Sequence, residues 1–419
     1  MGMNRRHFIQ VGLGGLAAAA LAPARGVLAL GGLRERNGMT PKLSERVVIV
    51  NLRGGIDTMT SYVYHGLNAY YSRRPNIAVP APNPGNVLAA LPAETGFGFH
   101  PLLSELHTAY TNGEMAIVQK TGYPSPNLSH FSSQDIMSKG VRDLAHPDTR
   151  GWLGRLGDLY FTETIKIVGV GTGNKLDYVS NGFKPVVVDD LASLTIPTDA
   201  GQPTDSTYRN DKAEEILSGS GPLTGLRAQI ASSTESAFEL AESIQNAIAN
   251  YPGNVTYPNT TFANNLRDIS QLIFANLGTQ VFYVETGGFD THANQINSVG
   301  NLYPNLSQGL GAFITDLKGM GAYSNTTLIL LSEFGRRNFE NGGGGTDHGH
   351  GVHFAVIGGS VNGGRKGQAV TNADLLLDYL PGEVDFRQVY SEVIQDRLCV
   401  DPTPVFPDWT HPGGSLNLF

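Results

Sequence analysis

Short apolar runs rich in Val, Ile and Leu recur along the chain, separated by longer stretches of mixed polarity. Runs of this length that contain β-branched residues and end at glycine or polar residues are typical of strands buried on both faces of a mainly parallel sheet. The predicted strands are residues 47–52, 115–118, 165–170, 186–188, 281–284, 328–331 and 354–357.

Between these runs, apolar residues recur every three or four positions, which predicts amphipathic helices. The predicted helices are residues 102–110, 131–137, 213–217, 234–249, 262–277 and 306–317. Strands that alternate with helices favour an α/β fold, here a three-layer sandwich in which helices cover both faces of a mainly parallel central sheet.

Two stretches interrupt this alternation. Residues 74–99 are rich in Pro and Gly, and residues 190–260 contain polar connections on either side of a helical segment, so both are expected to be loop insertions. The candidate site residues described below extend from residue 57 to residue 350. We therefore favour a single domain over residues 30–419, with these two insertions, over two separate domains.

The amino terminus has the features of an export signal. Arg5 and Arg6 are followed by Phe8, a short apolar segment over residues 11–21, and the small-x-small sequence at residues 22–24. The apolar segment is too short to span a bilayer, and no other apolar run approaches 18 residues, so no stable membrane span is expected. We predict that residues 1–29 are a twin-arginine signal peptide and that the twin-arginine export machinery delivers a periplasmic or extracellular protein. The alternative is an amphipathic terminal helix or a retained anchor.

Composition excludes several classes of function. Hydrophobic residues make up 40% of the 419 residues and charged residues only 16%, which suits a globular chain with a large core. The net charge of −8 and the lack of a Lys/Arg stripe argue against nucleic acid as a partner. The single cysteine, Cys399, excludes an intramolecular disulfide and a thiolate metal cluster. A bound metal would therefore need oxygen and imidazole ligands.

Acids and histidines follow the predicted strands directly. Asp57 follows the first strand, Asp290 and His292 follow the strand at 281–284, and Glu333 ends the strand at 328–331. The carboxyl ends of parallel strands meet at one edge of a sheet, so we expect these side chains to lie close together. Such donors bind divalent cations, and the sequence predicts one or two ions, Zn, Mg, Ca or Mn.

A further group of ligand residues lies in the glycine-rich loop that precedes the last predicted strand. Asp347, His348 and His350 are separated or flanked by single glycines, which allow the loop to fold tightly around an ion. Glu333 would be costly to bury without a cation, and either a metal or Arg336 would satisfy it.

Each of these acids also has a purely structural interpretation. Asp57 and Asp290 both follow a Gly-Gly-x sequence, and either aspartate would serve as a helix N-cap. His292 would then be solvated, and the histidine-rich loop would be a polar surface loop.

Ser129 is the candidate nucleophile. It precedes the predicted helix 131–137, where unpaired amides and the positive end of the helix dipole favour a nucleophilic hydroxyl or an anion. The alternative is that Ser129 only caps the helix by accepting a hydrogen bond from the amide of Ser132. His130 is either an acid, a metal ligand or a structural residue. The arginines that follow Glu333, such as Arg336, suit an anionic substrate.

Several motifs together resemble the exported proteins of the domain of unknown function 1501. The motifs are Leu52-Arg53-Gly54-Gly55-x-Asp57, Ser129-His130-Phe131-x-x-Gln134-Asp135, Gly151-Trp152-Leu153-x-Arg155, Gly287-Gly288-Phe289-Asp290-Thr291-His292, Ser332-Glu333-Phe334-Gly335-Arg336 and Gly345-Thr346-Asp347-His348-Gly349. This resemblance covers nearly all of the expected mature chain. That family is related to the alkaline phosphatase and sulfatase superfamily, which implies an alkaline phosphatase-like α/β sandwich and usually two divalent ions.

The resemblance also implies roles for individual residues. Asp57 resembles the metal aspartate of the first strand, Ser129 the nucleophile, and His348 or His350 the last histidine ligand. Asp290 with His292 resembles the superfamily's aspartate-histidine pair, although its histidine usually comes four residues after the aspartate, where this chain has Asn294.

Glu333 stands where an aspartate ends a later strand in the superfamily, but Phe334 replaces the histidine that usually follows. The function implied is a secreted, metal-dependent hydrolase that acts on a small anionic phosphate or sulfate ester. In that reaction Arg336 or Arg53 would offset negative charge in the transition state. The alternative is a non-catalytic exported protein that uses the same fold for metal binding or assembly.

Overall fold

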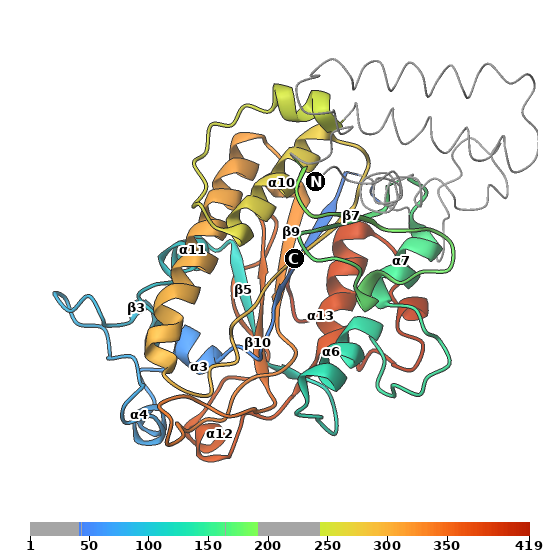
Figure 1. Cartoon of the computed structure of the whole chain (residues 1–419). Helices are drawn as coiled ribbons and strands as arrows, with labels where there is room; N and C mark the ends of the chain where they lie inside the picture. Colours follow the sequence, from blue (N-terminus) through green and yellow to red (C-terminus); the bar gives the residue numbers. More distant parts are fainter. Residues whose placement is uncertain (1–41, 43, 164, 192–243) are drawn as a thin grey trace, which may run out of the picture.

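The computed structural model describes residue 42 and residues 44–163, 165–191 and 244–419 (Figure 1). The predicted signal peptide, the predicted helix 213–217, the first ten residues of the predicted helix 234–249 and most of the 190–260 insertion lie outside these residues. Residues 244–249 are described and are helical, as predicted. Within the described part of the chain, no helix is both long and apolar enough to cross a membrane.

A nine-stranded sheet forms the centre of the protein, in the order β11-β5-β10-β9-β1-β8-β6-β7, with β12 also paired to β5. The strands are β1 (Arg46–Leu52), β5 (Met115–Gly122), β6 (Ile167–Val170), β7 (Val186–Val188), β8 (Val281–Thr286), β9 (Thr326–Leu331), β10 (Val352–Ile357), β11 (Gly364–Lys366) and β12 (Val384–Asp385). Every strand predicted from the apolar runs is therefore confirmed. The short strands β11 and β12 were not predicted, because they carry too few apolar residues to stand out.

The sheet is mainly parallel, as predicted. β1 pairs in parallel with β8 and β9, and β6 pairs in parallel with β8 and β7. The exception is β10, which runs antiparallel to both of its neighbours, β9 and β5. Because β5 and β9 both oppose β10, they point in the same direction as each other.

Helices cover both faces of the sheet, which confirms the three-layer α/β sandwich (Figure 1). One layer contains α5 (Ser104–Thr111), α10 (Thr261–Ala275) and α11 (Gln295–Gly319), and α11 packs against both of the others. The opposite layer contains α6 (His130–Lys139), α7 (Trp152–Tyr160) and α13 (Phe386–Val393).

The predicted helix 306–317 is only the second half of α11. The helix continues toward its amino end through Pro304, which cannot donate a backbone hydrogen bond. Val299 and Tyr303 are buried in the same core as Leu306 and Leu310, so tertiary packing extends the helix beyond the segment that periodicity indicated.

The predicted insertion at 74–99 has some regular structure. β3 (Leu91–Glu94) and β4 (Phe97–Phe99) form a three-stranded antiparallel sheet with β2 (Tyr62–Val63). Phe97 and Phe99 are fully buried in the main core, so this part of the insertion packs against the domain instead of standing free as a loop.

The strand directions determine which loops meet. The carboxyl ends of β1, β5, β8 and β9 lie at one edge of the sheet, and because β10 is antiparallel its amino end lies at that edge too. The loop segments 53–57, 123–129, 287–294 and 332–351 therefore gather at this edge, and they contain every candidate site residue except His130, the first residue of α6.

The helix α6 is held in place near its carboxyl end by Asp177. This residue lies in the 3-10 helix η1 (Leu176–Tyr178), is buried, and accepts a 2.8 Å hydrogen bond from Ser138 Oγ. Burial raises the pKa of the Asp177 carboxyl to about 6, because the charged form loses its hydration.

The raised pKa of Asp177 predicts a pH-dependent effect on stability. A carboxyl whose folded pKa lies above its unfolded pKa lowers stability as pH rises from about 4 to about 6, and the loss persists at higher pH. Asp177→Asn keeps an oxygen that accepts from Ser138 but cannot ionise. We expect Asp177→Asn to increase the free energy of unfolding by on the order of 2 kcal/mol more at pH 8 than at pH 4. Equilibrium denaturation of both proteins at the two pH values measures this, and an equal effect at both would contradict it.

Candidate functional site

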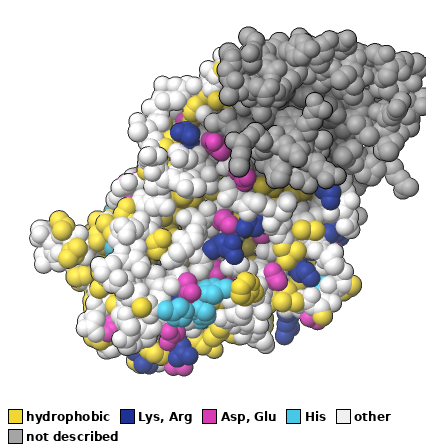
Figure 2. Space-filling view, in the orientation of Figure 1, with side chains coloured by type: hydrophobic (Ala, Val, Ile, Leu, Met, Phe, Trp, Pro, Cys, Tyr) yellow, Lys and Arg dark blue, Asp and Glu magenta, His cyan; other side chains and the backbone are white. Residues whose placement is uncertain are grey.

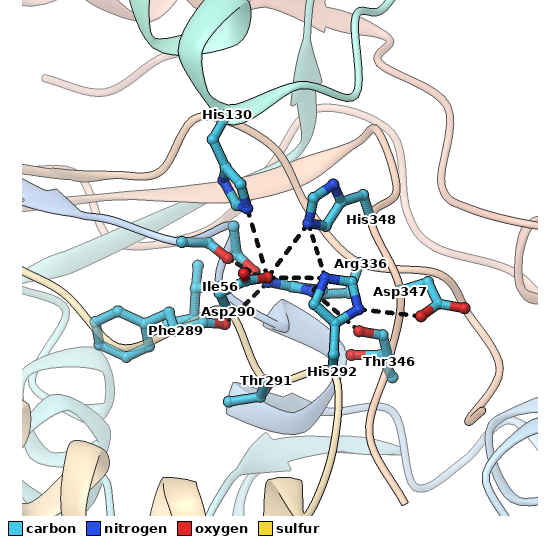
Figure 3. A network of polar contacts seen from close by, with 12 residues as sticks. Ile56, His130, Phe289, Asp290, Thr291, His292, Arg336, Thr346, Asp347 and His348 are labelled. Carbon is cyan, nitrogen blue, oxygen red and sulfur yellow. Dashed lines mark hydrogen bonds and ion pairs between the residues drawn. The ribbon is translucent and has the colours of Figure 1, made fainter. Parts of the chain in front are cut away.

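Three histidines and one aspartate converge at the carboxyl edge of the sheet (Figure 3). His130 comes from the start of α6, Asp290 and His292 come from the loop after β8, and His348 comes from the loop before β10. One ligand atom from each of His130, Asp290 and His348 lies within 4.8 Å of the other two. On the surface, histidine side chains form a compact patch with acidic side chains beside it (Figure 2).

The contacts centre on one oxygen of Asp290. Oδ1 of Asp290 lies 3.0 Å from His292 Nε2, 3.2 Å from His348 Nε2 and 3.4 Å from His130 Nε2. The Nε2 atoms of His292 and His348 are 3.0 Å apart. These separations between donor atoms suit ligands that share one ion at about 2.0–2.2 Å.

Each imidazole is oriented by a contact on its other nitrogen. Nδ1 of His130 lies 2.7 Å from Glu333 Oε1, and Nδ1 of His292 lies 3.1 Å from Asp347 Oδ1. Nδ1 of His348 lies 2.8 Å from the carbonyl oxygen of Leu128. All three partners are acceptors and suit a proton on Nδ1, which is the tautomer that a metal bound at Nε2 requires. Histidines that bind metals in proteins are commonly held in this way.

This arrangement fits a divalent ion. The Nε2 atoms of His292 and His348 lie 3.0 Å apart, close enough to share one ion, and Nε2 of His130 is buried without a hydrogen-bond partner. Burial lowers the pKa of His348, and the positive charge of Arg336 contributes to the same effect. The neutral imidazole that results is the form that binds a metal.

Arg336 holds Asp290 and the surrounding loops. Its guanidinium is fully buried and donates to Oδ1 of Asp290 and to the carbonyl oxygens of Gly54, Gly55, Phe289 and Thr346. Burial alone would raise the pKa of Asp290, but the hydrogen bond and charge of Arg336 lower it to about 2. Arg336 is thus occupied by protein acceptors and keeps Asp290 ionised.

Glu333 supports His130 and is not part of the group of donors around Asp290. Its carboxylate accepts hydrogen bonds from the amide of Gly54, from Gln134 Nε2 and from Ser332 Oγ, as well as contacting His130. Burial opposes its ionisation, but these hydrogen bonds lower its pKa below the ordinary value. The sequence offered a metal or Arg336 as the partner of this acid, and the structure instead provides amide, hydroxyl and imidazole donors.

Asp57 is a helix N-cap, which is the structural alternative given above for this residue. It is the N-cap of α3 (Thr58–Ser61), and its buried carboxylate lies 2.6 Å from Arg74 Nη1 and 2.6 Å from Gln295 Nε2. Burial alone would raise its pKa, but the charge of Arg74 and these hydrogen bonds lower it. The donors around its carboxylate come from Met59, Thr60, Arg74 and Gln295, so the structure does not bring Asp57 together with the histidines.

The histidine-rich loop divides its residues between different roles. His348 joins the group around Asp290, and Asp347 orients His292 while accepting a hydrogen bond from Asn341 Nδ2. His350 is buried elsewhere, with Nε2 3.3 Å from the amide nitrogen of Tyr123 and its ring against Gly122. Of the two histidines that the resemblance offered as the last ligand, the structure brings only His348 to Asp290.

Ser129 lies between two residues that contact the site. Leu128 holds His348 through its carbonyl oxygen, and His130 contributes its ring. Ser129 is the N-cap residue of α6, but its side chain makes no capping hydrogen bond and is exposed. The capping bond to Ser132 that the sequence offered as an alternative is therefore absent, and the Ser129 hydroxyl is accessible at the helix start.

Sequence analysis missed the residues that link the loops. Gln134 connects Glu333 to Arg53, and Gln295 connects Asp57 to Thr346. The position of Gln134, four residues after His130 on the same helix face, was the available signal. No local pattern marks Gln295 as a partner of Asp57.

Gly54 allows the loops after β1 and β8 to approach each other. It has φ of +117°, and a Cβ atom there would lie 2.5 Å from the amide nitrogen of Asp290. Its own amide donates to Glu333. A side chain at this position would therefore displace the loop that carries Asp290 and His292.

The solved structures that match this chain have low identity and low TM-scores. A Vibrio parahaemolyticus protein of the alkaline phosphatase superfamily is 11% identical with a TM-score of 0.36, covering 99% of this chain and 80% of that one. The lipoteichoic acid synthase LtaP of Listeria monocytogenes is 9% identical with a TM-score of 0.31, covering 91% and 80%. The alkaline phosphatase of the Antarctic bacterium TAB5 is 10% identical with a TM-score of 0.30, covering 75% and 92%.

The family assignment rests on the sequence, since structural similarity at this level gives no information about activity. No curated protein matches the chain significantly. The family described as "protein of unknown function (DUF1501)" matches residues 108–374, which contain every residue of the group around Asp290. The chain is therefore a member of the DUF1501 family.

Proposed function

We propose that this protein is an exported, metal-dependent hydrolase of phosphate or sulfate esters, with Ser129 as its nucleophile. One observation carries the proposal: three imidazoles, each fixed through Nδ1, direct Nε2 toward Asp290. Ser129, which directly precedes one of these histidines, has an uncapped and exposed hydroxyl at a helix start. Metal ligands and a helix-start hydroxyl are the parts that such a hydrolysis needs.

The ligands in this proposal are His130, His292, His348 and Asp290. Three imidazoles and one carboxylate favour zinc over magnesium or calcium, which prefer oxygen ligands. A divalent ion held there would act as a Lewis acid that stabilises negative charge on the ester oxygens. Glu333, Asp347 and Leu128 hold the imidazoles in place, and Arg336 holds Asp290.

Ser129 carries the covalent step in this proposal. Its Oγ attacks the phosphorus or sulfur atom, the bond from that atom to the ester oxygen breaks, and the serine proton passes through solvent to the departing alcohol oxygen. Water then cleaves the seryl ester, which releases phosphate or sulfate and restores the hydroxyl. The amides at the start of α6 and the helix dipole favour the anion at this position.

Metal content tests the proposed ligands. We expect the protein purified with zinc to hold one ion per chain, and His348→Ala to weaken zinc binding by more than the 10–100-fold typical of changes to supporting residues. His350→Gln is the matched control, because His350 lies in the same loop but contacts Tyr123. Elemental analysis and zinc titration of the folded proteins measure this. Equal zinc affinity in His348→Ala and the control would remove His348 from the site.

Turnover tests the role of Ser129. We expect Ser129→Ala to lower kcat for a phosphate or sulfate ester by at least about a thousandfold, because the nucleophile is lost, while zinc content stays unchanged. Ser132→Ala is the control, since Ser132 lies on the same first turn of α6. A screen of aryl and alkyl phosphate and sulfate esters supplies the substrate. If wild type and Ser129→Ala are equally inactive on all of them while both bind zinc, the non-catalytic metal-binding or assembly role is the better explanation.

Export through the twin-arginine pathway is part of the proposal and lies outside the described residues. We expect Arg5→Lys/Arg6→Lys to leave the full-length chain in the cytoplasm, because that pathway recognises the arginine pair. Fractionation of cells that produce the native and substituted chains, with immunoblotting, measures the mature protein outside the cytoplasm. Equal export of both chains would exclude this route.

A further inference from the structure

Two basic side chains share one carboxylate next to the candidate site. Oε1 of Glu285 lies 2.7 Å from Lys175 Nζ and 3.3 Å from Arg53 Nη1. Arg53 follows β1, Lys175 lies in the loop after β6, and Glu285 is in β8, which pairs with both strands. The group therefore lies at the same edge of the sheet as the histidines.

A chain of hydrogen bonds connects this basic pair to the histidines. Nη2 of Arg53 donates to Gln134 Oε1 at 2.9 Å, and Nε2 of Gln134 donates to Glu333, which contacts His130. The carbonyl oxygen of Arg53 accepts from the amide of Phe289, which precedes Asp290. Figure 2 shows a compact group of Lys and Arg side chains on the same face as the histidine patch.

The positive charge of the pair is only partly offset. Both cations contact the same oxygen of Glu285, whose other oxygen is buried without a hydrogen-bond partner. A second acid, Asp177, interacts electrostatically with Glu285 and Lys175, but it is buried and accepts a hydrogen bond from Ser138. The side chains of Arg53 and Lys175 are 40% and 21% exposed, so the cations face solvent more than these acids do.

A contribution to folding stability does not explain why Arg53 and Lys175 share one oxygen of Glu285. Partly exposed ion pairs contribute little to the stability of a fold, and two cations on one carboxylate oxygen repel each other. A guanidinium has five N–H donors and an ammonium has three, so both groups have capacity for a further acceptor. An anion placed between them would relieve the repulsion.

We propose that Arg53 and Lys175 bind a second anionic group of the substrate, apart from the ester that is cleaved. The preferred substrate is then an ester that also carries a carboxylate, phosphate or sulfate. This inference rests on the proposed function for the identity of the first group, the ester at the histidines.

Non-hydrolysable ligands separate binding from turnover. The probes are alkylphosphonates of increasing chain length that end either in a methyl group or in a carboxylate, with the corresponding sulfonates as a second series. The zinc-loaded full chain is titrated with each probe by calorimetry. We expect the carboxylate-ended probe of the best length to bind at least about tenfold more tightly than its methyl-ended partner, as for a charge-assisted contact.

The double variant Arg53→Gln/Lys175→Gln tests the residues themselves. We expect it to lose this preference while affinity for methyl-ended probes and zinc content change less than about twofold. Arg46→Gln/Lys318→Gln is the matched control, because it removes the same net charge away from the site. Arg46 is partly buried at the opposite end of β1, and Lys318 is exposed at the carboxyl end of α11. The control is expected to keep the preference.

Three results would overturn the inference. They are equal affinity for both probe types at every length, a preference that survives in the double variant, and an equal loss of affinity for methyl-ended probes. The last result would mean that the cations bind the reacting group itself. If the preference is found but wild type hydrolyses no ester, the proposed hydrolysis fails and the anion site remains.

Discussion

The site depends on how each imidazole is held through its Nδ1 atom. Glu333 and Asp347 lie in the loop over residues 332–351 and the Leu128 carbonyl lies in the loop over residues 123–129, and each fixes one ring so that Nε2 faces Asp290. Without such an acceptor, a histidine ring is free to rotate and to change tautomer. These contacts exist in the protein alone, so the cost of ordering the ligands falls on folding and does not weaken metal binding.

Arg336 fixes the loops that carry these residues. Its buried guanidinium bridges the carbonyl oxygens of loops that follow β1 and β8, and it also contacts Asp290. A buried guanidinium needs acceptors on most of its N–H groups, and the loop carbonyls supply them only in this arrangement. The loops approach so closely at Gly54 that a Cβ atom there would lie 2.5 Å from the amide nitrogen of Asp290, so this position also requires glycine.

The charges around the site are arranged in two neighbouring regions. Asp290 and Glu333 stay ionised beside the histidines, so a cation is favoured between the imidazoles. Arg53 and Lys175 lie beyond Gln134, with a single shared carboxylate, so an anion is favoured there. A ligand that carries two acidic groups would match a bound ion at the first region and the basic pair at the second.

The amino-acid sequence by itself determined the layers of the fold and the segments that form the site. Buried parallel strands require continuous apolar runs, and the residues that follow such strands must lie at one edge of the sheet. That reasoning correctly located the strands and brought Asp290, His292 and His348 to the same edge.

Only the tertiary structure decided which of these side chains act together. Asp57 and Asp290 both follow Gly-Gly-x after a strand. Arg74 and Gln295 bind the carboxylate of Asp57 apart from the histidines, whereas Arg336 binds the carboxylate of Asp290 among them. His348 and His350 are two residues apart, but one meets Asp290 and the other packs against Tyr123. The direction of each side chain depends on partners far along the chain, and no local pattern encodes those partners.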